Sequence, residues 1–159
     1  MSKTINQDEA KNKYIKYWKI RIFYSTYIGY LLYYFTRSRF KSIGTLLSES
    51  NLVNQSQFGI ILASHSFVYA ISKFIGGIFA DSTDPRYLMS FGLIIAGIIN
   101  IFIVKSYNFY TFLVLWTLNG FVQGFGWPPV AKLFTNWFSK TEKATWWGVW
   151  STSHNVGEA

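Results

Sequence analysis

The sequence contains no cysteine among its 159 residues, and it has only three prolines and two methionines. Without cysteine, the chain forms neither a disulfide nor a thiolate metal site. Charge is also scarce, because charged residues make up 14% of the chain, whereas soluble domains usually carry about 25%. The seven acids are outnumbered by fifteen lysines and arginines, so the formal net charge is +8. This composition argues against an ordinary soluble domain.

Apolar and aromatic residues are abundant instead, at 50% and 21% of the chain. The basic residues do not form a stripe with interleaved aromatics on a polar face, so they do not indicate a nucleic-acid partner. Many of them cluster before or at the first apolar run, as expected for a cytoplasmic flank under the positive-inside rule. Six residues form this cluster: Lys3, Lys11, Lys13, Lys16, Lys19 and Arg21. We therefore predict a membrane protein with a cytoplasmic N-terminus.

The apolar runs predict an all-α membrane protein, since a membrane helix needs about 20 mostly apolar residues. The predicted helices are at about residues 19–40, 58–80, 87–104, 109–133 and 146–159. Residues 1–18 would form a cytoplasmic tail, and residues 134–145 an interfacial connector. The last run has 14 residues and would span about 21 Å, less than a hydrocarbon core of roughly 30 Å. We therefore expect a fragment, or the product of a truncated gene.

The fourth run contains two features that bear on helix packing. Trp127-Pro128-Pro129 predicts a break or kink, which is tolerated where the backbone faces protein or a cavity. Gly120 and Gly124 form GxxxG, and such small residues let helices approach closely. The glycine-rich segment that contains Gly120 and Gly124 does not follow a predicted strand, so we exclude a dinucleotide-binding loop. In the second run we interpret His65 as a polar residue in helix packing.

Three ionisable residues stand inside the predicted membrane helices: Arg37, Lys73 and His154. Such groups cost about 2.5–3.5 kcal/mol on insertion scales and are functional candidates by default. Each also has a structural interpretation. Arg37 could extend to the outer headgroups, and Lys73 could do so less easily from about 10 Å inside its run. His154 could be a satisfied core histidine.

Helical spacing places tyrosines beside both cations. Tyr30, Tyr34 and Arg37 follow i, i+4 and i+7, so they share one helix face. Tyr69 and Lys73 share a face of the second predicted helix. Neither cation has a nearby carboxylate in its own helix, so an anion would complete the site. Arginine offers a planar fork suited to phosphate and lysine a point charge, which predicts a phosphorylated small molecule or inorganic phosphate as ligand.

Three stretches carry a family resemblance: GYLLYYFTRSRF, YAISKFIGGIFADSTDPR and GFVQGFGWPPVAKLFTNWFSKTEKATWWGVWSTSHNVG. They resemble the organophosphate:inorganic phosphate antiporters of the major facilitator superfamily, which include glycerol-3-phosphate and hexose-6-phosphate transporters. The resemblance implies four helices and part of a fifth from a twelve-helix fold with two halves around a central substrate site. It implies a multi-pass protein of the bacterial inner membrane, monomeric at full length and without a cofactor. That protein would exchange a sugar phosphate for inorganic phosphate by alternating access.

The resemblance also implies roles for individual residues. Arg37 matches the first-helix arginine that grips phosphate, and Lys73 and His154 match cavity residues of the second and fifth helices. The other cavity-lining positions are Tyr30, Tyr34, Tyr69, Gln123 and Trp127. The cytoplasmic turn that serves gating matches Gly77, Asp81 and Arg86. The family's seventh-helix arginine would lie beyond residue 159, so we expect the fragment alone to be inactive.

The sequence departs from the family pattern at two positions and leaves alternatives open. Ser82 replaces a basic residue after the turn aspartate, and Glu158 replaces a small residue. The segment KLFTNWFSKTEKATWWGVW is most similar to the glucose-6-phosphate transporter and sensor branch, which favours hexose-6-phosphate over glycerol-3-phosphate. A glucose-6-phosphate sensor or a non-functional gene remnant stays possible. We do not predict an enzyme, because the sequence lacks an HExxH motif and paired carboxylates at membrane depth.

Overall fold

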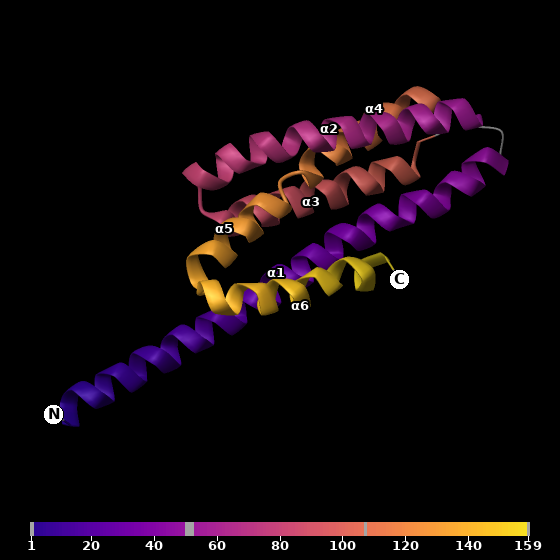
Figure 1. The fold of residues 1–159 in the computed structure, drawn as a ribbon. Coiled ribbons are helices and arrows are strands. Elements are labelled where there is room, and N and C mark those ends of the chain that lie inside the picture. The colour runs from indigo at the N-terminus through magenta and orange to yellow at the C-terminus, as the bar shows by residue number, and fades with distance from the viewer. Residues whose placement is uncertain (1, 50–52, 107, 159) are drawn as a thin grey trace.

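A computed structural model describes residues 2–49, 53–106 and 108–158, with side chains for residues 9–38, 40, 53–106 and 108–158. All the secondary structure of these residues is α-helix (Figure 1). The helices are α1 (Ser2–Glu49), α2 (Gln55–Ser82), α3 (Pro85–Val104), α4 (Phe109–Gln123), α5 (Trp127–Trp137) and α6 (Lys140–Glu158). Ala159, which ends the predicted fifth helix, lies outside the described residues.

The helices run up and down along one bundle axis, except that α5 continues in the direction of α4 (Figure 1). The closest pairs are α2 with α4, α1 with α6, and α3 with α4. The N-terminal part of α1 projects beyond the bundle as a single extended helix (Figure 1). The result is two packed regions: one joins α1 and α6, and the other joins α2, α3 and α4.

The first helix is much longer than the apolar run at residues 19–40 suggested, because α1 has 48 residues. Its polar N-terminal part contains lysine, glutamate and alanine but neither proline nor glycine, and these residues favour helix. Hydropathy marks where the chain becomes polar, whereas propensity and capping decide where a helix ends. The helix α1 therefore contains the predicted membrane run and extends beyond it at both ends.

Three of the other helices begin at a polar capping residue. Each of them starts at the predicted apolar run or a few residues before it. Asn54 caps α2: its side chain accepts from the backbone N–H of Gln57 at 2.8 Å, and the Gln57 side chain accepts from Asn54 N–H at 3.0 Å. Asp84 caps α3, which has a proline in its first turn, and Asn108 caps α4. These caps satisfy N–H groups that have no partner inside the helix.

The predicted fourth helix at residues 109–133 is two helices in the structure, α4 and α5, separated between Gln123 and Trp127. This is the break that the two prolines predict, because proline supplies no N–H and clashes with the preceding turn. Most of the connector predicted at residues 134–145 is helical. Helix α5 continues to Trp137 and α6 begins at Lys140, leaving only Phe138 and Ser139 between them.

Small residues set the close approach of α4 to α2. A Cβ added at Gly120 would lie 2.7 Å from the backbone oxygen of His65. One added at Gly124 would lie 2.5 Å from the Cβ of Ser72. His65 itself is buried and stacks on Trp116, with ring centroids 4.7 Å apart. The GxxxG motif and His65 therefore serve helix packing, as the sequence predicts.

Two of the described helices, α2 and α3, are long and apolar enough to cross a membrane by length and composition. Their outward faces carry large apolar side chains such as Phe74, Ile78, Phe91 and Ile94, each more than 60% exposed. In water, such an uncovered apolar surface would be unusually large for a monomer. It is the surface expected of helices that face lipid.

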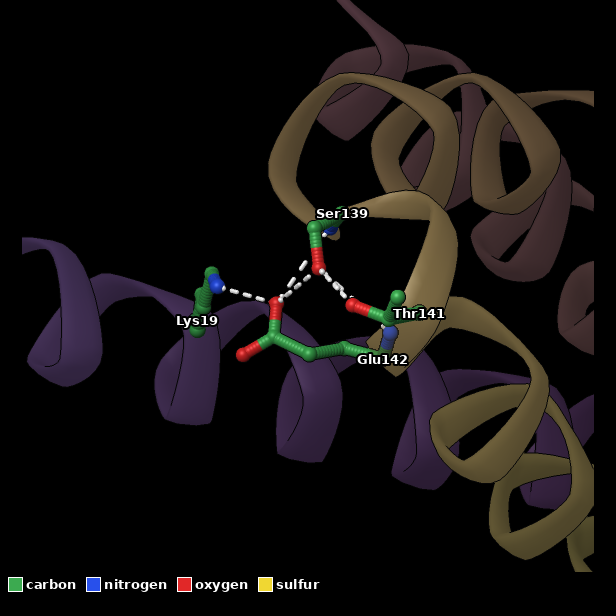
Figure 2. Close-up of polar contacts among 4 residues, drawn as sticks. All are labelled: Lys19, Ser139, Thr141 and Glu142. Atoms are coloured by element: carbon green, nitrogen blue, oxygen red, sulfur yellow. Dashed lines mark hydrogen bonds and ion pairs between the residues drawn. The ribbon is translucent and has the colours of Figure 1, made fainter.

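An ion pair ties the first helix to the start of the last (Figure 2). Lys19 Nζ of α1 lies 2.6 Å from Glu142 Oε2 of α6. The same carboxylate oxygen accepts from Ser139 Oγ at 2.9 Å and from the Ser139 backbone N–H at 3.3 Å. The lysine first, and then both Ser139 donors, lower the pKa of Glu142 from its ordinary value near 4.5 to about 2.

The depressed pKa of Glu142 predicts how this contact depends on pH. Its contribution should be fully present above the ordinary pKa near 4.5 and should be lost as the pH falls through about 2. We expect Glu142→Gln to lower the thermal midpoint modestly at pH 5–8, because an exposed pair contributes little. The difference from the wild type should shrink below pH 4.5. Thermal unfolding across this range measures it, and a difference independent of pH would contradict the ion pair.

Candidate functional site

Two cations from different helices meet on one aromatic ring. The guanidinium carbon of Arg37 in α1 lies 5.0 Å from the ring centroid of Tyr69 in α2, and Lys73 Nζ lies 4.4 Å from the same centroid. Within the described residues, neither cation forms an ion pair with a carboxylate. Cation–π contacts position both charges but do not neutralise them. The structure therefore joins the two cations that the sequence could only place on separate helices.

His154 of α6 packs against two tyrosines of α1. Its ring meets Tyr30 and Tyr34 edge-on, with centroids 4.9 and 4.7 Å apart. Its Nδ1 lies 2.6 Å from the backbone oxygen of Ser151. A carbonyl oxygen only accepts, so Nδ1 carries the hydrogen and Nε2 stays available to another partner. The histidine is thus oriented rather than merely buried.

Close packing of α6 against α1 holds this arrangement together. A Cβ added at Gly157 would lie 2.6 Å from the backbone oxygen of Leu31 and 2.7 Å from Tyr34 Cβ. Trp150 packs on Tyr30, with centroids 4.5 Å apart, and its ring is almost fully buried. The absence of a side chain at Gly157 therefore lets α6 bring His154 onto the tyrosine face of α1.

The tyrosines connect the two groups of site residues. The ring centroids of Tyr30 and Tyr34 lie 5.4 Å apart, on the face of α1 that also carries Arg37. The i, i+4, i+7 face of α1 predicted from the sequence thus meets both α2 and α6. Six of the predicted cavity residues form one connected group: Tyr30, Tyr34, Arg37, Tyr69, Lys73 and His154.

Gln123 instead belongs to a chain of buried amides. Its Nε2 donates to Asn119 Oδ1 at 2.5 Å, and Asn119 Nδ2 donates to Asn100 Oδ1 at 3.2 Å and to Ala96 O at 3.3 Å. These bonds join α4 to α3, and Asn119 is fully buried. The sequence analysis missed both asparagines, although an amide inside an apolar run is itself a signal that helices hydrogen-bond there.

Trp127 is 40% exposed and meets Trp147 of α6 edge-on, with centroids 6.1 Å apart. No contact among the described residues joins Trp127 or Gln123 to Arg37 or Lys73. The cavity-lining role that the resemblance implies for these two residues stays a prediction.

The turn between α2 and α3 is fixed by a lysine that the sequence analysis did not assign to it. Lys132 of α5 donates through Nζ to the backbone oxygens of Ala80 and Asp81, the latter at 3.1 Å. These carbonyls belong to the C-terminal turn of α2, where cations satisfy free acceptors and complement the helix dipole. The only sequence signal is a lysine near the end of an otherwise apolar run.

The predicted turn residues have separate surroundings in the structure. Asp81 is exposed, and a Cβ at Gly77 would meet nothing within 4 Å. Arg86 pairs with Asp84, with Nε 3.3 Å from Oδ1, rather than with Asp81. The backbone N–H of Arg86, more than its charge, lowers the pKa of Asp84. The gating role of Gly77, Asp81 and Arg86 stays a prediction.

The arrangement suits anion binding rather than metal chemistry or acid–base catalysis. In the part of the chain that the structure describes, no three histidine or acidic side chains gather as they would around a metal ion. The site instead presents two cations, several phenol hydroxyls and one oriented imidazole. These groups donate hydrogen bonds to an oxyanion and to hydroxyl groups.

Known proteins similar to the chain carry names that agree with this chemistry. A probable hexose phosphate transport protein of Chlamydia pneumoniae is 49% identical over 99% of this chain and 34% of its own length. The membrane sensor protein UhpC of Escherichia coli (strain K12) is 41% identical over 91% of this chain and 33% of its own. A glycerol-3-phosphate transporter of Bacillus subtilis is 33% identical over 87% of this chain and 32% of its own. The chain therefore spans about a third of the length of these relatives.

A solved structure has the same fold. The bacterial homolog of the human lysosomal transporter Spinster, in an inward-facing and unoccupied conformation, matches with a TM-score of 0.79 at 17% identity. The match covers 86% of this chain and 29% of that one. It confirms the predicted all-α fold.

These findings confirm the resemblance to the organophosphate branch, and they favour transport proteins and a sensor over an enzyme. The sequence pattern of the Major Facilitator Superfamily matches residues 26–159, which is most of the chain. The chain belongs to the Major Facilitator Superfamily.

Proposed function

We propose that the full-length gene product carries a sugar phosphate across the bacterial inner membrane in exchange for inorganic phosphate, with hexose-6-phosphate as the favoured substrate. The observation that carries this proposal is the pairing of Arg37 and Lys73 on Tyr69 without a carboxylate partner among the described residues. Relatives named for hexose phosphate transport, at 47–49% identity, support the choice of substrate.

Charge balance explains why the ligand should be a phosphate ester. Each uncompensated cation at membrane depth costs about 2.5–3.5 kcal/mol. A phosphate ester carries nearly two negative charges at neutral pH and would offset both cations at once. The arginine fork would hold two phosphate oxygens, and the lysine would contribute a point charge.

The same balance favours exchange over one-way transport. An empty site would have to reorient with two cations beside one tyrosine ring and no anion between them, at low effective dielectric constant. A bound sugar phosphate or inorganic phosphate removes that repulsion. Alternating access would therefore proceed readily only with an anion bound, which couples the outward and inward movements.

The sugar part of the substrate would lie near His154. The available Nε2 of His154 and the hydroxyls of Tyr30 and Tyr34 can each exchange a hydrogen bond with a sugar hydroxyl. Gln123 and Trp127 would complete the cavity from the α4–α5 side, as the resemblance implies.

The basic residues support a cytoplasmic N-terminus. Lys19, Arg86 and Lys132 lie at one end of the bundle, which the Lys19–Glu142 and Lys132–Asp81 contacts define. An excess of lysine and arginine is typical of the cytoplasmic side. We propose that Gly77, Asp81 and Arg86 gate that side, and that the full-length protein acts as a monomer.

Counterflow in proteoliposomes tests the function. We expect vesicles loaded with inorganic phosphate to accumulate radiolabelled glucose-6-phosphate, and vesicles without internal phosphate to show little uptake, because an empty site reorients slowly. Vesicles lacking protein provide the control for leakage.

Two other results would identify an alternative. Binding of glucose-6-phosphate without any exchange would indicate a sensor, as the name of the Escherichia coli relative suggests. Exchange that prefers glycerol-3-phosphate would indicate a glycerol-3-phosphate antiporter, in line with the name of the Bacillus subtilis relative. Either result would overturn the hexose-6-phosphate antiporter.

A further inference from the structure

A second feature of the bundle lies outside the proposed substrate site. A cavity of about 500 Å³ lies between α1, α3 and α5. Its lining includes Trp18, Arg21 and Ile22 from α1, Arg86 and Met89 from α3, and Leu133 from α5. Arg21 and Arg37 are sixteen residues apart in α1, so the two arginines are separated by about 24 Å along the helix. The cavity is therefore distinct from the substrate site.

The polar part of this cavity is cationic. Its lining contains two arginines and no carboxylate. The guanidinium of Arg21 lies 5.2 Å from the ring of Trp18 and 5.4 Å from that of Tyr17, and its Nη1 donates to Tyr17 Oη at 3.1 Å. These contacts orient the charge and leave it uncompensated, because Arg21 forms no ion pair with any described acid.

Arg86 contributes a weaker positive charge. Its Nε pairs with the carboxylate of Asp84 at 3.3 Å, which offsets part of the charge. Its side chain is 70% exposed, and within the described residues no hydrogen bond engages its two terminal nitrogens. Arg86 can therefore assist in holding an anion, whereas Arg21 is the principal cation.

Most of the remaining lining is apolar, and Ser25, Thr26 and Ser90 add neutral hydroxyl groups. Ile22, Met89 and Leu133 form the wall between the helices, and Trp18 and Trp137 flank it. Tryptophans beside arginines at the end of a membrane helix are typical of the headgroup level of a bilayer. A free phosphate ion would leave this wall uncovered, whereas a phospholipid would cover it with its acyl chains.

We propose that this cavity binds an anionic phospholipid of the cytoplasmic leaflet. Its phosphate contacts Arg21, with Arg86 assisting, and its acyl chains lie along Ile22, Met89 and Leu133. Charge complementarity selects the anionic headgroup, since each lysine or arginine near the surface favours an anionic lipid by roughly fivefold in binding. The lipid joins α1 to α3 at the end of the bundle that carries the predicted gating turn.

Lipid retention measured by native mass spectrometry tests the proposal. The full-length gene product is extracted from nanodiscs that contain equal amounts of phosphatidylglycerol and phosphatidylcholine. We expect the wild type to retain phosphatidylglycerol preferentially, and Arg21→Gln to lose about fivefold of that preference. Arg86→Gln should lose less. Lys105→Gln provides the matched control, because Lys105 is exposed beyond the C-terminal end of α3, away from the cavity.

A second variant keeps both arginines. Ser25 is exposed and lines the same cavity, so Ser25→Glu places a carboxylate beside the headgroup and should also abolish the preference. If Arg21→Gln fails to fold, Ser25→Glu tests the lipid-binding proposal in its place. An unchanged preference in the folded variants, or an equal loss in Lys105→Gln, overturns the proposal. Displacement of phosphatidylglycerol by inorganic phosphate alone overturns it too, because a free anion would then suffice.

Discussion

Arg37→Lys is expected to abolish phosphate-driven uptake of glucose-6-phosphate by the full-length gene product while leaving membrane insertion intact. Lysine keeps the charge but loses the planar fork that, in the proposed function, would hold two phosphate oxygens. Loss of two charge-assisted hydrogen bonds, at about 1.5–3 kcal/mol each, corresponds to at least about a hundredfold lower uptake. Uptake into phosphate-loaded vesicles measures the effect, with the amount of inserted protein determined in the same preparation.

Arg21→Lys is the matched control for this prediction. It makes the same chemical change in the same helix, but Arg21 contacts Tyr17 and Trp18 rather than the Tyr69 site. We expect its uptake to stay close to that of the wild type. Uptake at the wild-type rate in Arg37→Lys would remove the observation on which the proposed function rests.

Gly124→Leu is expected to have the largest effect on folding. A Cβ at this position would lie 2.5 Å from Ser72 Cβ and 2.9 Å from the backbone carbon of Ser72. Backbone cannot move aside as the end of a flexible side chain can, so α2 and α4 must separate. Overpacking typically costs about 1–3 kcal/mol even for smaller changes. The free energy of unfolding of a whole domain is only about 5–15 kcal/mol. The yield of monodisperse protein and its thermal midpoint measure the loss.

Gly97→Leu provides the comparison, since a Cβ at Gly97 in α3 would meet nothing within 4 Å. We expect Gly97→Leu to behave like the wild type, or slightly better, because glycine disfavours helix by about 1 kcal/mol. Equal tolerance of leucine at both positions would show that α4 does not approach α2 as closely as the structure indicates.

The sequence predicted most of the helices, and it named six residues that the structure brings together in the candidate site. Apolar runs located α2 and α3 closely, and the prolines after Trp127 predicted the break between α4 and α5. It did not predict the polar extensions of α1 and the polar first turns of α6, because hydropathy does not indicate where a polar segment is helical. Spacing along one helix was also enough to identify the face that Tyr30, Tyr34 and Arg37 share.

Contacts between helices were beyond the reach of the sequence. Nothing local pairs Arg37 with Tyr69, places Lys132 at the end of α2, or links Asn119 to Asn100. Among helices in lipid, hydrophobicity gives little preference for one neighbour over another, so small residues and interhelical hydrogen bonds decide the pairing. These interactions join positions that are far apart in the chain.

The sequence by itself therefore determined an all-α membrane protein, its family resemblance and two cations in apolar runs without a nearby carboxylate in their own helices. Those properties depend on composition and on spacing within one helix, where geometry is fixed by 3.6 residues per turn. Only the tertiary structure decided that both cations share the ring of Tyr69, that Gly157 lets His154 reach the tyrosines, and that Arg21 and Arg86 line one cavity. Each depends on how closely two helices pack, which the shapes of both surfaces set together.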